Sequence, residues 1–134
     1  LIHEWDYLTW IFGMPSHCAA VIGKVSDLEI DSNDIALYVA RNKQMTFELH
    51  LDYFGRKTQR TLDIFTKDDT IHCDIIAGTV SYLKEKKELS FDRERNNYQM
   101  KEIAHFFDIA EGKLNNDSNV EHGVKVLKLT KAIL

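Results

Sequence analysis

The sequence predicts an α+β fold, a two-layer sandwich in which an open, mostly antiparallel sheet of about six or seven strands has helices packed on one face. Apolar residues recur at helical spacing in residues 1–12 and again in residues 96–134, whereas the stretch between them alternates with period two. A run of strands framed by helices, without regular alternation of strand and helix, favours an antiparallel sheet over a parallel one.

The bulk composition fits one globular domain. The chain has 134 residues, of which 44% are hydrophobic and 28% charged, and its formal net charge is −4. A chain of this length typically forms a single domain with its own core. Net acidity without clustered Lys and Arg argues against nucleic-acid binding, and no apolar run is long enough for a membrane span. We expect a cytoplasmic protein in which Cys18 and Cys73 remain free core thiols.

Residues 1–12 form the first predicted helix. An apolar stripe recurs at helical spacing in the residues Leu1, Trp5, Leu8 and Phe12. Gly13 suits the C-terminal end of a helix, and Pro15 cannot continue one. Because the sequence begins inside this helix, at Leu1 rather than at a Met, we expect the chain to be a fragment of a longer protein.

Residues 17–91 carry the strand pattern. Residues 17–25 form one apolar strand, and residues 35–40 predict a strand buried on both faces. The clearest alternation lies in residues 45–53, and it resumes in residues 58–66 after a hairpin signal at Gly55. Shorter strands follow to residue 91. We expect one polar sheet face, which is either solvated or faces a partner, with the side chains Glu48, His50, Asp52, Gln59, Thr61 and Asp63 on it.

Two helices complete the predicted fold. Asn96 or Asn97 can cap a helix that runs to about Glu111, with Phe106 among its expected core residues. Ser118 and Glu121 form a capping box for a last helix that leads to the end of the chain.

The candidate for chemistry is the first helix. Four residues share a face at spacings of three and four: His3, Asp6, Tyr7 and Trp10. An imidazole can move protons at neutral pH, a carboxylate one turn away can orient it, and aromatic rings can stack on a sugar ring. By residue types alone, a helix end with a surface histidine and a partly buried tryptophan is the commoner interpretation.

Other sites are weaker in the sequence. Glu48, His50 and Asp52 share a strand face but have no fourth ligand, so no metal site is predicted. His122 has no acid–base neighbour at useful spacing. None of the six glycines makes a GxGxxG pattern, so we expect no cofactor-binding residues in this chain.

Residues 3–15, HEWDYLTWIFGMP, resemble the C-terminal domain of the Gfo/Idh/MocA oxidoreductases, named for glucose–fructose oxidoreductase and inositol dehydrogenase. In that family a helix carries an Asp, a His, a second Asp, an aliphatic–aromatic pair and Gly-x-Pro. Asp69 departs from the pattern, because the family often has Gly there. Weaker matches follow in the same order along the chain, at Leu51-Asp52-Tyr53 with Arg56 or Arg60, Thr70-Ile71 with Asp74, Tyr98, Glu102 and His105, and Gly123 through Leu129.

The resemblance implies that residues 1–134 are a single C-terminal substrate-binding and oligomerisation domain whose N-terminal Rossmann domain is absent. The parent would be an NAD(P)-dependent oxidoreductase that transfers a hydride to or from a sugar, sugar nucleotide or polyol, and the missing domain would bind NAD or NADP. His3 would be the catalytic acid/base, and Asp6 and Trp10 match positions that support this helix. That Asp6, Tyr7 and Trp10 bind the carbohydrate-like substrate is our own hypothesis, which the resemblance does not imply. The open sheet face would form a homodimer, and the fragment alone would be inactive. The alternative is a non-catalytic oligomerisation or ligand-binding module.

Overall fold

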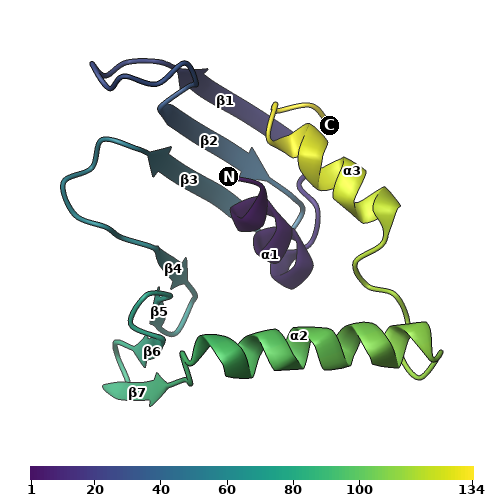
Figure 1. Ribbon diagram of the computed structural model, residues 1–134. Coiled ribbons are helices and arrows are strands. Elements are labelled where there is room, and N and C mark those ends of the chain that lie inside the picture. Colours follow the sequence, from purple (N-terminus) through teal and green to yellow (C-terminus); the bar gives the residue numbers. More distant parts are fainter. The chain divides into compact units, whose positions relative to one another are not determined.

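The computed structural model describes residues 1–134 and confirms the α+β fold (Figure 1). The helices are α1 (Ile2–Phe12), α2 (Arg95–Ala110) and α3 (Val120–Leu129). The strands are β1 (His17–Gly23), β2 (Ile35–Arg41), β3 (Thr46–Asp52), β4 (Thr61–Phe65), β5 (Thr70–Asp74), β6 (Thr79–Tyr82) and β7 (Lys87–Ser90). All strand pairs are antiparallel.

The chain divides into two compact units, and each contains one sheet. Unit 1 consists of Leu1–Arg56 and Asp117–Leu134, with the strand order β1-β2-β3; unit 2 is Lys57–Asn116, with the order β4-β5-β6-β7. Because β3 and β4 belong to different sheets, the predicted hairpin at Gly55 is wrong. Gly55 instead follows an Asx-type turn in which its backbone N–H donates to Asp52 Oδ1 at 2.6 Å.

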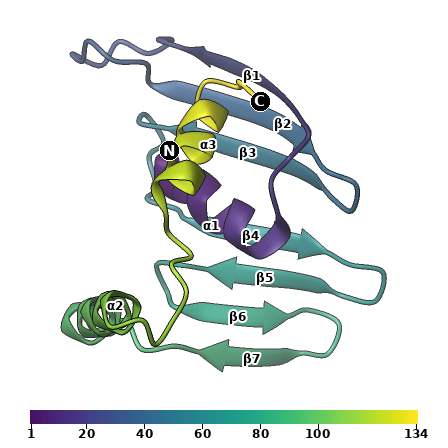
Figure 2. The same ribbon diagram turned by 90° about the vertical axis from the view of Figure 1, so that its right-hand side faces the viewer.

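In unit 1, α1 and α3 cover one face of the sheet (Figure 2). Trp5 lies edge-on to Tyr38 with 5.4 Å between ring centroids, and the Tyr38 hydroxyl donates to the Thr130 carbonyl at 2.7 Å. These contacts hold α1 and the C-terminal end of α3 against the central strand, β2. The fully buried side chains are Trp5, Tyr38, Asp34, Val126 and Leu129.

The open face of this sheet corrects one expectation. Strand β2 is not buried on both faces, because Tyr38 is enclosed whereas Val39, which points the other way, is 61% exposed. The helices cover only one side, so every second residue of β2 remains accessible.

Helix α1 has the predicted Gly13 cap, but α3 ends at Leu129, five residues before the end of the chain to which the sequence extends it, and the N-terminal caps of α2 and α3 differ from those predicted. Gly13 closes α1 with a φ of 83°, a conformation that favours glycine. Helix α3 is capped by Asn119, whose side chain accepts from the His122 N–H at 2.9 Å, so the predicted Ser118 capping box is wrong. Helix α2 begins after Glu94 without a side-chain cap rather than at Asn96 or Asn97.

In unit 2 the period-two pattern separates a polar sheet face from an apolar one. A polar row crosses the strands in register, through Asp63, His72, Ser81 and Glu88. His72 Nδ1 lies 2.6 Å from Asp63 Oδ1, and the Ser81 hydroxyl donates to Glu88. Helix α2 has no buried side chain, and Phe106 is 64% exposed, so its assignment to the core is wrong.

Candidate functional site

Helix α1 presents a polar and aromatic face to solvent, and this face holds all four candidate residues. His3, Asp6 and Trp10 are exposed and Tyr7 is half-buried. Trp5 and Leu8 occupy the opposite, buried face, as helical geometry requires. Trp10 is 69% exposed, which leaves its indole ring open to a ligand.

The C-terminal end of α1 is fixed to the turn between β2 and β3. The Asn42 side-chain amide donates to the Phe12 carbonyl at 2.9 Å, and its oxygen accepts from the N–H groups of Gln44 and Met45. One side chain thus satisfies a terminal helix carbonyl and shapes a turn, and the candidate face is therefore held on a rigid support.

Asp6 has a partner that the sequence did not reveal. His122 Nε2, on α3, lies 3.1 Å from Asp6 Oδ1, although the two residues are 116 positions apart. Spacing in the sequence suggested that Asp6 could orient His3 and gave His122 no acidic neighbour, whereas the structure brings Asp6 and His122 together. Local spacing could not find this pair, because only the packing of α3 against α1 brings it together.

A surface hollow of about 450 Å³ in unit 1 is lined in part by His122 but by none of the four candidate residues. Its lining is predominantly polar, with Lys125 bound to Glu121 at 2.7 Å on one side. The lining residues are Thr9, Met14, Asp117, Asn119, Glu121, His122 and Lys125. Such groups can hydrogen-bond the hydroxyls of a carbohydrate.

Unit 2 has a hollow of its own of about 620 Å³, lined in part by Arg60, Asp92 and Tyr98. None of the four candidate residues lines it.

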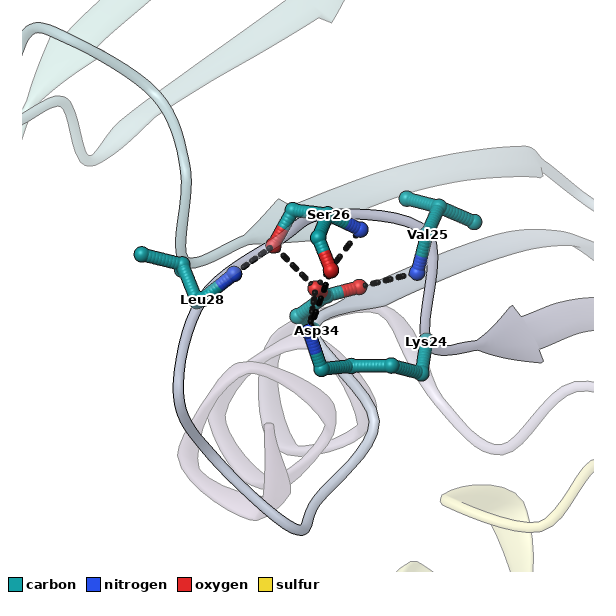
Figure 3. Close-up of polar contacts among 5 residues, drawn as sticks. All are labelled: Lys24, Val25, Ser26, Leu28 and Asp34. Carbon is teal, nitrogen blue, oxygen red and sulfur yellow. Dashed lines mark hydrogen bonds and ion pairs between the residues drawn. The ribbon is translucent and has the colours of Figure 1, made fainter.

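Asp34 is a second acidic residue that the sequence did not single out, and it is almost completely buried. Figure 3 shows its polar contacts. Its carboxylate accepts from the Val25 N–H at 2.7 Å and the Ser26 N–H at 3.0 Å, and it also binds the Ser26 hydroxyl and the Lys24 ammonium. Burial raises its pKa, but these hydrogen bonds outweigh burial and hold the pKa well below its usual range. Asp34 therefore anchors the loop between β1 and β2 and is not available for proton transfer near neutral pH.

The cysteines are free, as predicted, but neither is a fully buried core residue. Burial is the main cause of a raised pKa at both Cys18 and Cys73, so neither thiol is activated.

The described residues contain neither a glycine-rich turn from a strand into a helix nor a cluster of metal-binding side chains. A dinucleotide site needs a glycine-rich turn between a strand and a helix, but α2 and α3 begin after Glu94 and Asn119. No cluster of three or more His, Cys, Asp or Glu side chains is arranged to hold a metal. On β3, His50 instead lies 3.2 Å from Asp52. No helix has the combined length and apolarity needed to cross a membrane.

The fold is similar to that of UDP-N-acetylglucosamine 3-dehydrogenase GnnA from Acidithiobacillus ferrooxidans, with a TM-score of 0.78 and 20% sequence identity. The match covers 97% of this chain and 42% of that chain, so this chain spans less than half the length of the dehydrogenase. No family model and no curated protein matches. The likeness establishes that the α+β fold of this chain is one found in part of a sugar-nucleotide dehydrogenase.

Proposed function

We propose that this chain is the substrate-side part of an NAD(P)-dependent oxidoreductase of the Gfo/Idh/MocA type, acting on a sugar, sugar nucleotide or polyol. Residues 3–15, on which the family resemblance rests, form most of helix α1 and the turn after it, and they leave His3, Asp6 and Trp10 exposed. This arrangement, in a fold similar to part of a sugar-nucleotide dehydrogenase, is the observation that carries the proposal. Fold alone does not define function, so the argument depends on the residues of that face.

In this proposal His3 exchanges a proton with the reacting hydroxyl or carbonyl of the substrate. Its exposed position on α1 leaves the imidazole accessible to a ligand. The exposed indole of Trp10 offers a flat apolar surface for a sugar ring, and Tyr7 lies beside it on the same helix. Asp6 borders the substrate while His122 holds one of its oxygens.

In this proposal the nicotinamide cofactor is bound by another part of the parent protein, because the sequence of this chain has no GxGxxG pattern. A chain that provides only the substrate side is expected to be inactive by itself. A cytoplasmic location, a carbohydrate-like ligand and no nucleic-acid or membrane partner complete the proposal.

Turnover of the complete oxidoreductase tests the role of His3. With UDP-N-acetylglucosamine, other sugar nucleotides and polyols as substrates, His3→Ala should lower kcat by about 100-fold or more, since a general acid or base contributes that much. The affinity for NAD or NADP should remain nearly unchanged. His17→Ala, which removes an exposed histidine on β1, is the matched control. Equal rates for His3→Ala and the unmodified enzyme would remove His3 from the mechanism.

A second candidate function is a non-catalytic oligomerisation module, and the open face of the unit 1 sheet favours it. Val21 and Val39 are mostly exposed on this face. Val39 pairs with Glu48, and Val21 lies in the same row as His50, across Leu37 of β2. We propose that this face forms the homo-oligomer contact in either case. Light scattering of a Glu48→Lys, His50→Glu double variant should give a lower mass than the unmodified chain; an unchanged association state would exclude this face as the interface.

A further inference from the structure

The outer edge of the unit 1 sheet differs from the other sheet edges of the chain. Strand β1 pairs only with β2, so the backbone groups along its other side have no strand partner (Figure 1). Its seven residues, HCAAVIG, contain no Lys, Arg, Asp, Glu or Pro, and their register with β2 runs without a bulge. Proteins normally protect an edge strand with one of these features, because an unprotected edge pairs readily with another strand.

The remaining edge strands are protected. Strand β3, at the opposite edge of the same sheet, carries Glu48 and Asp52. In unit 2, β4 carries Asp63 and β7 carries Lys87 and Glu88. The absence of charge is therefore specific to β1.

On the helix-covered face of the sheet, the side chains of β1 are less buried than those of β2. Ile22 lies on the helix-covered face, opposite Ala36 of β2, yet Ile22 is 38% exposed whereas Ala36 is 8% exposed. Cys18 and Ala20, on the same face, are only partly buried. Helices α1 and α3 thus cover β2 better than they cover β1, and a further strand beside β1 would bury the exposed part of Ile22.

The sequence of β1 is complementary to itself. If two copies pair antiparallel with Ala20 opposite Ala20, then Ala19 lies opposite Val21, Cys18 opposite Ile22 and His17 opposite Gly23. Each larger side chain meets a smaller one on the same sheet face, and no like charges meet. A two-fold contact of this kind requires such self-complementarity.

We propose that the edge of β1 binds the β1 edge of a second copy of this chain, which joins the two three-stranded sheets into one continuous sheet. This contact uses backbone hydrogen bonds along an edge, so it is separate from the open-face contact proposed above and does not depend on the enzymatic role.

Disulfide trapping tests this pairing at residue resolution. In a background with Cys18→Ala and Cys73→Ala, the variant Ala20→Cys places two thiols directly opposite one another, at about 4.5–5.5 Å between Cα atoms, which a disulfide can span. The matched control Ala19→Cys places them on a diagonal about 7–8 Å apart, where a disulfide is disfavoured.

Mild oxidation should yield at least about tenfold more covalent dimer for Ala20→Cys than for Ala19→Cys, with both reduced variants giving folded NMR spectra. Sedimentation of the unmodified chain should give a mass that rises with concentration toward the dimer. Equal trapping of the two variants, or a monomer at all concentrations with no trapping, would overturn the proposal. Because a face variant such as Glu48→Lys leaves the edge intact, trapping of Ala20→Cys in that variant separates this contact from the open-face contact.

Discussion

At the scale of single residues, two carboxylates of unit 1 have opposite roles. Asp34 is enclosed and uses its oxygens to hold a loop, whereas Asp6 is exposed and has one imidazole partner. Helical spacing singled out Asp6 in the sequence, but no pattern indicated that Asp34 would be buried. The contacts in the folded chain give Asp34 a role in stability and place Asp6 at the candidate site.

Asp34 should make the stability of the chain depend on pH in the acid range. Its pKa in the folded chain lies below the ordinary 3.8, so its stabilisation is complete above about pH 5 and is lost as the pH falls below about 4 and through the folded pKa. Urea unfolding at pH 7 should show a lower midpoint for Asp34→Asn, and the difference from the unmodified chain should shrink toward pH 3. The control Asp27→Asn, in the same loop, should have little effect at any pH. A difference between Asp34→Asn and the unmodified chain that grows as the pH falls would contradict the assignment.

The Asp6–His122 pair should give a small but measurable coupling. A double-mutant cycle with Asp6→Asn and His122→Gln, measured by urea unfolding, is expected to yield about 0.2–1 kcal/mol, because both side chains retain contact with water. The Glu121–Lys125 ion pair provides a reference, because both of its residues lie on α3, one turn apart. Its expected coupling is about 0.3–0.5 kcal/mol. No coupling between Asp6 and His122 would mean that α3 does not restrain this face of α1.

At the scale of elements, sequence periodicity predicted the positions of the helices and strands more accurately than it predicted which of their faces are buried. The helical repeat located α1, and Trp5 and Leu8 are buried as that repeat requires. In α2 the same kind of repeat failed for Phe106, because an amphipathic pattern indicates a helix without identifying a surface that covers it. The caps failed for a related reason, since Ser118 and Asn119 are both good capping residues and only the backbone decides between them.

Two side-chain truncations measure the difference in burial between α3 and α2. Leu129→Ala in α3 should reduce the free energy of unfolding by about 2–5 kcal/mol, because the side chain is fully buried. Phe106→Ala in α2 should cost less than about 1 kcal/mol, because most of that ring is already in water. Chemical denaturation of each variant provides the comparison. Similar losses for the two variants would mean that α2 is covered by a surface that this account does not include.

At the scale of the whole molecule, the sequence predicted the fold class, the order of elements and about six or seven strands, of which the structure has seven. It did not predict that the strands form two sheets, since alternation defines a strand and its faces but not its neighbours. Likewise the four candidate residues were found by helical spacing, whereas His122 was not, because its contact with Asp6 joins opposite ends of the chain. Helical spacing predicts which residues share a helix face, whereas contacts between segments far apart in the chain depend on tertiary packing and cannot be predicted in this way.

The central claim is that the exposed face of α1 receives a carbohydrate-like substrate. An NMR titration of residues 1–134 with UDP-N-acetylglucosamine up to about 10 mM tests it directly, since even a millimolar dissociation constant gives measurable shifts at that concentration. We expect saturable changes in the His3 imidazole and Trp10 indole signals, which Trp10→Ala weakens and uridine alone does not reproduce. Changes confined to unit 2, or none in α1 at the highest concentration, would contradict the claim.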